Sequence, residues 1–268
     1  MREILEDCKK VTQGTIFSNA RSNDFYDEVY GILVNGRCDL EHLNHYDNYL
    51  YLPIIPYKLW ESKIAIKKVL ERKHKDIINI LISYENTFSY RALLYMPEHI
   101  DEIIEQYIKK PKDQEKIRCA LFFLKIYEKY EKNIDFLEKE INDFKTFFSS
   151  DFDAIRKDLI DNKLPDSVYL ENVDIQEQNK QKTDHYVVLI TEIHSIPKKA
   201  IIMLENGIDL ESHEELKQFF GDDQIIIPCS TLTSPYIEHL IQKMWELFRV
   251  GIDRADNFEI QQNGGTSI

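Results

Sequence analysis

The sequence predicts an α+β protein: a discontinuous β-rich domain, either a small barrel or a bent sheet, with a large helical insertion and an amphipathic C-terminal helix. Short β-branched and aromatic runs occupy the first and last parts of the chain, as strands do. The residues between them are rich in Lys, Glu, Leu, Ile and Phe and contain no glycine, as helices do. We therefore expect residues 1–56 and 165–254 to form one domain, residues 57–164 a helical insertion and residues 255–268 a flexible tail.

Seven short segments are expected strands, because most are rich in β-branched or aromatic residues and are bounded by Asn, Ser, Gly or Pro. Pro53 lies inside one of them and predicts an edge strand or a strand end, since proline has no amide hydrogen to donate to a neighbouring strand. A turn at Pro197, Lys198 and Lys199 is expected to separate two of the later strands. The expected strands are residues 11–17, 29–35, 49–55, 167–173, 185–196, 200–204 and 224–228.

The middle of the chain is expected to form about four to six helices. The expected breaks lie near His74, Phe88, Pro97, Pro111 and the Ser149–Ser150 pair. One group of apolar residues recurs at alternating steps of three and four residues, which places them on one helix face and predicts packing against another helix, in this chain or in a partner. This stripe consists of Ile134, Leu137, Ile141, Phe144 and Phe148.

A final helix is expected after Ser234 and Pro235, because serine caps free backbone amides and proline suits the first helical position. Apolar residues then recur at helical spacing along one face, and Gly251 stands where a helix C-terminal glycine is expected. We expect this helix to offer a surface for docking another protein, or else to pack in the core. The residues of the expected interaction surface are Tyr236, Ile237, Leu240, Trp245 and Phe248.

The composition narrows the range of partners. Acidic residues outnumber basic ones by 47 to 34, and the formal net charge of −13 disfavours non-specific binding to nucleic acid or anionic lipid. A charged partner should therefore be basic or locally complementary. The N-terminus lacks the apolar core of a signal peptide, no apolar run is long enough for a membrane span, and the four cysteines are scattered. We expect a cytoplasmic protein in a reducing environment.

The strongest candidate site is the run Arg37-Cys38-Asp39-Leu40-Glu41-His42-Leu43-Asn44-His45, which follows the expected strand at residues 29–35. Loops at strand ends often carry reactive groups, because the scaffold positions them and solvent reaches them. One hypothesis is an enzyme that uses Cys38, Asp39 and a histidine, either His42 or the distant His185. The order of Cys38 and His185 resembles papain-like proteases, in which the histidine begins a strand, but the glycine-rich context and later asparagine of those enzymes are not recognisable.

A metal site is a second hypothesis, in which Cys38, His42 and His45 supply the ligands, although a fourth ligand is not evident. A nuclease-like pattern occurs only in loose form and lacks the usual lysine two positions after the acidic residue; its members are Asp184, Glu192 and Lys198. Neither Gly-x-x-x-x-Gly-Lys nor Gly-x-Gly-x-x-Gly occurs, and the sequence does not specify a cofactor.

The simpler interpretation of the same run is structural. Cys38 is then a small buried residue, Asp39 caps the turn or helix that follows, and the histidines are solvated. The same interpretation treats the other histidines of the later part of the chain as surface or hydrogen-bonded residues. These are His185, His194, His213 and His239.

Two segments resemble uncharacterised bacterial proteins that carry a strand ending in Cys-Asp and a C-terminal helix beginning with Ser-Pro. The first is Gly31-Ile-Leu-Val-Asn-Gly-Arg-Cys-Asp-Leu40, and the second is Ser234-Pro-Tyr-Ile-Glu-His-Leu-Ile-Gln242, followed by Phe248-Arg-Val-Gly-Ile252. Those proteins are similar to accessory members of mobile-island and phage-defence gene clusters. The resemblance implies no known reaction.

The sequence therefore favours a bacterial cytoplasmic accessory protein that acts through protein–protein interaction, in phage defence or stress signalling. The docking surfaces expected are the helical stripe and the C-terminal helix. The alternative is a Cys/His-dependent hydrolase or a metal-dependent enzyme centred on Cys38 and Asp39. The sequence does not specify the partner or the oligomeric state.

Overall fold

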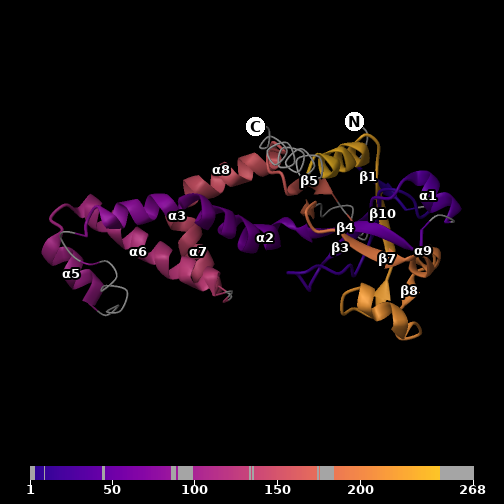
Figure 1. Cartoon of the computed structure of the whole chain (residues 1–268), viewed down its shortest axis with the longest axis horizontal. Coiled ribbons are helices and arrows are strands. Elements are labelled where there is room, and N and C mark those ends of the chain that lie inside the picture. Colours follow the sequence, from indigo (N-terminus) through magenta and orange to yellow (C-terminus); the bar gives the residue numbers. More distant parts are fainter. Residues whose placement is uncertain are drawn as a thin grey trace, which may run out of the picture. The chain divides into compact units, whose positions relative to one another are not determined.

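The computed structural model describes residues 4–8, 10–43, 46–85, 89, 99–132, 134, 136–173, 175 and 184–247. The chain divides into two compact units, whose elements are labelled in Figure 1. The first, which we call the sheet unit, combines Met1–Tyr57 with Asp158–Ile268, and the second, the helical unit, is Lys58–Lys157.

The sheet unit is built on one antiparallel sheet. Within the described residues, eight strands form it: β1-β10-β2-β3-β4-β6-β5 in that order, with β7 also paired to β4. Strands from the first and last parts of the sequence are thus neighbours in one curled half-barrel. The strands are β1 (Leu5–Asp7), β2 (Thr15–Phe17), β3 (Tyr30–Leu33), β4 (Asn48–Pro56), β5 (Ser167–Val173), β6 (Asp184–Leu189), β7 (His194–Pro197) and β10 (Pro228–Leu232).

The strand β4 lies inside the sheet and organises it. β3 pairs along one edge of β4, while β7 pairs with residues 48–51 and β6 with residues 54–56 along the other edge. Pro53 lies opposite Gly31 of β3, between the residues of β4 that pair with β7 and those that pair with β6. Its missing amide hydrogen therefore falls in the gap between these two partner strands. The prediction that Pro53 marks an edge strand or a strand end is therefore wrong.

The core of the sheet unit joins aliphatic side chains of the sheet to the helix over residues 236–247. Ile16, Ile32 and Leu52 come from the adjacent strands β2, β3 and β4, are all fully buried and belong to one core cluster on the same face of the sheet. On the opposite face, a Cβ at Gly31 would clash with the ring of Phe17, so glycine is needed for this ring to lie against β3.

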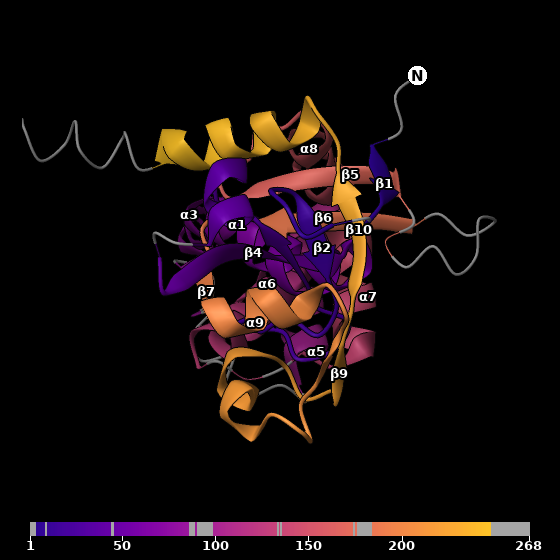
Figure 2. The same ribbon diagram turned by 90° about the vertical axis from the view of Figure 1, so that its right-hand side faces the viewer.

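Shorter elements complete the sheet unit. They are α1 (Arg37–His42), α9 (Lys198–Leu204), the 3₁₀ helix η3 (Glu214–Phe219), and a two-stranded sheet of β8 (Ile208–Asp209) and β9 (Ile225–Ile226). In Figure 2, α1 lies next to the yellow helix over residues 236–247, and α9 and β9 lie farther along the sheet.

The segment at residues 200–204 was expected to be a strand and instead belongs to α9, so this prediction is wrong. A short apolar run fits a strand and a buried helix equally well by periodicity. The side chains of Ala200, Ile201 and Leu204 are buried together, at the spacing of one helix face. Pro197 precedes the helix in extended conformation and forms its N-terminal boundary.

In the helical unit, α2 (Tyr57–Trp60) continues through a π-helical turn, η1 (Glu61–Ala65), into α3 (Ile66–Ile82). The predicted breaks at Pro111 and Ser149 are confirmed, but α3 runs through His74, whose ring stacks on Tyr127 with centroids 4.0 Å apart. The predicted breaks at Phe88 and Pro97 lie outside the described residues. The remaining helices are α5 (Ile100–Tyr107), α6 (Pro111–Glu131), α7 (Glu138–Phe147) and α8 (Ser149–Ile160).

A cluster of aromatic rings forms the core of the helical unit. The fully buried ring of Phe144 lies within 6.4 Å, between centroids, of those of Phe122, Phe123, Phe148 and Phe152. The predicted apolar stripe is therefore correct for Phe144 and Phe148. It is wrong for Ile134 and Leu137, which precede the start of α7 and are exposed.

Partly buried ion pairs tie the helices together around this cluster. Glu61 accepts hydrogen bonds from Lys145 at 2.5 Å and from Arg156 at 2.9 Å, and Lys129 donates to both carboxylate oxygens of Glu140 at 2.6 and 2.7 Å. Burial alone would raise the pKa of Glu140, but hydrogen bonds from Lys129 and the Leu137 amide lower it below its usual value.

These elements confirm the predicted α+β class, with a sheet assembled from both parts of the sequence and helices inserted between them. Across the part of the chain that the structure describes, every helix is too short or too polar to traverse a lipid bilayer.

Candidate functional site

The helix α1 places the predicted residues Cys38 and Asp39 just beyond β3. Leu40 is buried and anchors this helix, whereas the side chain of Cys38 is exposed, so the interpretation of Cys38 as a small buried residue is wrong. The helix N-cap is Gly36, and Asp39 stands in the first turn, where a negative charge is favourable near the free amides. The structure thus leaves Cys38 accessible and Asp39 close to the helix N-terminus.

His185, the predicted base, lies at the start of β6. Its Nδ1 atom lies 2.8 Å from the hydroxyl of Tyr169, and the two rings stack with centroids 5.5 Å apart. The backbone amide of His185 donates to the carboxylate of Asp184 at 2.9 Å. The imidazole is therefore held on β5 and β6.

The structure does not bring Cys38 and His185 together. Tyr186, the residue after His185, pairs with Pro56 at one end of β4. Near the other end of β4, the Tyr49 hydroxyl donates to the carbonyl of Asp39 at 3.4 Å. The strand between residues 49 and 56 spans roughly 23 Å at about 3.3 Å per residue. A thiol and its general base must lie about 3 Å apart, so the predicted catalytic pair does not form in this structure.

The predicted metal ligands are only partly described. His42 is exposed in the last turn of α1, and His45 lies outside the described residues. Within the described ranges, no three His, Cys, Asp or Glu side chains are arranged to hold a metal ion. The nuclease-like residues also separate, because Asp184 begins β6 and Glu192 follows the other end of that strand.

Glu192 has a different environment, a polar network that ties residues 22–23 to β7. Its carboxylate accepts hydrogen bonds from the Ser22 hydroxyl at 3.1 Å and from the Asn23 amide, and lies 2.7 Å from Nε2 of His194. A serine nucleophile needs an imidazole next to its hydroxyl. Here the carboxylate lies between the hydroxyl and the imidazole, so the arrangement orders the chain and does not activate Ser22.

Tyr51 adds a second buried link in this region. Its hydroxyl accepts from the Arg21 amide and donates to the Arg21 carbonyl, both at 3.1 Å, and its ring stacks on His194 with centroids 5.4 Å apart. Burial raises the pKa of Tyr51 far above that of a free tyrosine, so the hydroxyl remains protonated.

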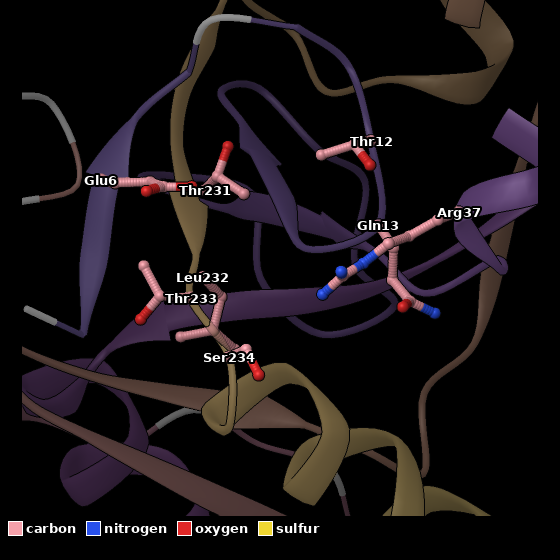
Figure 3. A pocket seen from close by; sticks show the side chains of 8 residues that line it. All are labelled: Glu6, Thr12, Gln13, Arg37, Thr231, Leu232, Thr233 and Ser234. Carbon is pink, nitrogen blue, oxygen red and sulfur yellow. The ribbon is translucent and has the colours of Figure 1, made fainter. Parts of the chain in front are cut away.

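A polar cavity of about 610 Å³ opens beside α1 (Figure 3). Hydroxyl and amide side chains form much of its wall, Arg37 contributes a guanidinium and Glu6 a carboxylate. The volume lies within the range of roughly 300–1,000 Å³ that small-molecule sites occupy, although such sites are usually more apolar. The lining residues are Glu6, Thr12, Gln13, Arg37, Thr231, Leu232, Thr233 and Ser234.

Gly14 allows the strands at this cavity to approach closely. Its φ is +88°, a conformation that other residues rarely adopt, and a Cβ would lie 2.8 Å from the carbonyl oxygen of Leu232. The Leu232 amide donates to the Gly14 carbonyl at 2.9 Å, and the Gly14 amide donates to the Leu33 carbonyl at 2.8 Å. This residue therefore joins β10 to the end of β3.

Arg37 connects α1 to the C-terminal helix. Its guanidinium lies 3.2 Å from the carboxylate of Glu238, and Figure 3 shows it extending from α1 across the cavity toward the end of β10. Both side chains are about half exposed, at 56% and 49%, so the ion pair contributes no more than about 1 kcal/mol. Arg37 and Ser234 line the same cavity, and the segments 31–40 and 234–242 therefore meet in space.

The C-terminal helix spans residues 236–247 of the described chain and is anchored on its inner face. Ile237 and Leu240 were predicted to dock a partner, but both are buried in the core of the sheet unit, so this assignment is wrong. The Thr233 carbonyl accepts from the Tyr236 and Ile237 amides, so Ser234 does not cap the helix as predicted. Lys243 donates to the carbonyls of residues 162 and 167, and burial lowers its pKa.

The outer face of the same helix presents Trp245, whose side chain is 62% exposed. Tyr236, at the start of the helix, is 37% exposed. Phe248, the last residue of the predicted interaction surface, lies outside the described residues. The predicted surface is therefore divided between an inner face that packs in the core and an outer face that reaches solvent.

Among the cavity residues, Arg37 was expected in the candidate site and Ser234 as a helix cap, and the other polar residues were not anticipated from the sequence. The expected strand at residues 224–228 overlaps β9 and stops where β10 begins, and β10 was missed because Leu232 is its one large apolar residue. The cavity itself depends on residues separated by most of the chain, so no local pattern predicts it.

Comparison of the chain with models of protein families, with curated proteins and with solved structures finds no match.

Proposed function

We propose that this chain acts by binding another protein, and that the contact surface is the outer face of the helix over residues 236–247. The observation that carries the proposal is Trp245, a large aromatic side chain that is 62% exposed on a helix whose inner face is buried. Tryptophan is enriched among the residues that dominate binding energy, and a helix already fixed in place loses little entropy when it binds.

The surroundings of Trp245 define the chemistry of the partner. Glu238 and Gln242 are exposed and share its helix face, seven and three residues before it, and the exposed Glu246 is the next residue along the chain, to the side of this face. Both carboxylates border the indole, that of Glu238 being ion-paired with Arg37, and they favour a partner with an apolar pocket and a basic rim. The net charge of −13 acts in the same direction, because it attracts a basic partner over long range.

The alternative of an enzyme centred on Cys38 and Asp39 has less support. Its nearest predicted base, His42, is exposed at the end of the same short helix, and His185 lies at the far end of β4. Neither the outer helix face nor the cavity depends on a reaction at Cys38.

Capture of partners from the native host tests the proposal. The bait is the full chain, with Trp245→Ala as the test variant and Tyr26→Ala as the control, because Tyr26 is an aromatic residue of the same unit with 74% exposure. Wild type and the Tyr26 variant should recover one protein in stoichiometric amount, and the Trp245 variant should lose it. Equal recovery by all three baits would contradict the proposal. Recovery should also fall as salt is raised, since the rim is charged.

We further propose that this binding serves phage defence, the setting that the family resemblance implies. A host strain lacking the gene should regain resistance to phage infection when it is supplied with wild type or the Tyr26→Ala variant, but not with Trp245→Ala. Full resistance in the strain supplied with the Trp245→Ala variant would show that this helix face is not needed for phage defence.

A further inference from the structure

Cys8 and Cys229, 221 positions apart in the sequence, are brought together by the pairing of β1 with β10. The register of this antiparallel pair runs from Leu5 opposite Leu232 to Asp7 opposite Ser230. β1 ends at Asp7, and continuing its register by one step would bring Cys8 opposite Cys229, the residue at which the pairing of β10 with β2 is irregular. Directly opposed residues in antiparallel strands have Cα atoms about 4.5–5.5 Å apart, within the range of about 4.4–6.8 Å that a disulfide spans.

The environment of each thiol is consistent with this placement. The Cys8 sulfur lies 3.7 Å from the carbonyl oxygen of Lys10 and 3.9 Å from the hydroxyl of Thr15, and the Cys229 sulfur lies 3.6 Å from the carbonyl oxygen of Ile227. Burial raises the pKa of Cys229 to about 12, and the nearby thiol of Cys8 adds to this effect. The two groups are thus close enough to interact electrostatically, and both are only partly buried.

We propose that Cys8 and Cys229 are a site of reversible oxidation, which forms an intramolecular disulfide with a small disulfide such as oxidised glutathione as the oxidant. The Cys8 thiolate attacks one sulfur of the oxidant and releases the first thiol molecule. The Cys229 sulfur then attacks the mixed disulfide at Cys8, loses its proton and releases the second. Two protein thiols are oxidised and one small disulfide is reduced to two thiols, so atoms and electrons balance.

Oxidation at this site would fix one wall of the polar cavity. Glu6 and Thr231 line the cavity and are paired across β1 and β10, two positions from the cysteines. β1 is a three-residue strand at the end of the sheet, and among the described strands it pairs with β10 alone. A covalent link to Cys229 would therefore hold this strand in place.

Peptide mapping by mass spectrometry under non-reducing conditions tests the proposal. The full chain is equilibrated with mixtures of oxidised and reduced glutathione, and a peptide linking Cys8 to Cys229 should appear as the oxidised fraction rises. The link should disappear in Cys8→Ser and in Cys229→Ser, and it should persist in Cys38→Ser, in which the exposed thiol is removed. The melting temperature of the linked protein should exceed that of the reduced protein.

Two outcomes would overturn the proposal. One is a map in which Cys8 carries glutathione at every ratio without any link to Cys229. The other is a link that joins either residue to Cys38 or Cys119 instead. Because Cys8→Ser changes a partly exposed residue at the end of a short edge strand, its folding can be checked by circular dichroism before the map is made.

Discussion

The sheet unit and the helical unit bury their apolar residues in different ways. The sheet unit packs aliphatic side chains from adjacent strands against one helix, and buried hydroxyl and carboxylate networks hold its loops. The helical unit instead surrounds Phe144 with aromatic rings and links its helices through charged pairs such as Glu61 with Lys145. The stability of the helical unit therefore depends on ring packing, and that of the sheet unit on backbone pairing and buried polar hydrogen bonds.

Both units also expose apolar side chains, and each exposed group is a candidate surface for binding a partner. In the sheet unit, Trp245 lies on a helix whose other face is buried. In the helical unit, Leu137 immediately precedes α7 and Phe147 is its last residue, and their exposures are 65% and 46%. The proposed function assigns partner binding to the first of these surfaces.

The largest effect should come from Phe144→Ala. Loss of a fully buried ring from the centre of the aromatic cluster should cost about 3–5 kcal/mol of unfolding free energy. Phe147→Ala, which truncates a ring that is 46% exposed, should cost far less. Urea unfolding measures both variants, and hydrogen exchange should show faster exchange in α6 and α7. An equal cost for the two substitutions would show that the ring cluster is not the main support of the helical unit.

Tyr51→Phe should produce the next largest loss, in the sheet unit. Removing the hydroxyl leaves the amide and carbonyl of Arg21 without this partner in a partly buried site, at a cost of about 2 kcal/mol. Urea unfolding again provides the measurement. A cost below about 0.5 kcal/mol would mean that solvent replaces the hydroxyl.

The same tyrosine should make stability fall at high pH. Burial raises the pKa of Tyr51 in the folded state, so its contribution is complete below the pKa of about 10 of an unfolded tyrosine and is lost as the pH rises above that value. The urea midpoint should therefore decrease more steeply between pH 9 and pH 11 (roughly one unit on either side of 10) in wild type than in Tyr51→Phe. Parallel curves for the two proteins would contradict this assignment.

Glu61→Gln should have a smaller effect, about 1–2 kcal/mol, because its partner Arg156 is half exposed and solvent screens that pair. Glu61 itself is only 17% exposed and also binds Lys145, so the loss should exceed that of a surface pair. Lys132→Gln, which removes an exposed pair with Glu128, is the matched control and should change the unfolding free energy by less than about 0.5 kcal/mol.

The smallest change in stability should come from Trp245→Ala, since this side chain is largely exposed. We expect less than about 1 kcal/mol in urea unfolding. Partner affinity should nevertheless fall by a factor of ten or more, as truncation of a central aromatic residue at an interface does. A variant that loses stability and binding together would assign Trp245 a structural role.

The sequence supported prediction of the class and of several strands because their signals are local. Residues 167–173 contain β-branched and aromatic residues, as strands do, and β5 has those bounds. The error at residues 200–204 arose because a short apolar run does not distinguish a strand from a buried helix turn.

The site was predicted less well, because its geometry depends on strand order. The distance between Cys38 and His185 follows from the way β4 separates α1 from β6, and no feature near either residue encodes this. The proximity of Cys8 to Cys229 is hidden for the same reason. Trp245 could be placed on a helix from its spacing, but whether that helix face packs inside or outside depends on the sheet.

The binding surface is tested most directly by comparing Trp245 with Leu137 and Phe147 of the helical unit, and the buried Trp60 serves as an internal reference that the partner should not affect. Trp60 is fully buried in the helical unit, and Trp245 is 62% exposed in the sheet unit. Hydroxyl-radical footprinting with the captured partner should reduce oxidation of Trp245 severalfold and leave oxidation of Leu137 and Phe147 unchanged. Protection of Leu137 and Phe147, with Trp245 oxidised as in the free protein, would contradict the account and assign binding to the helical unit.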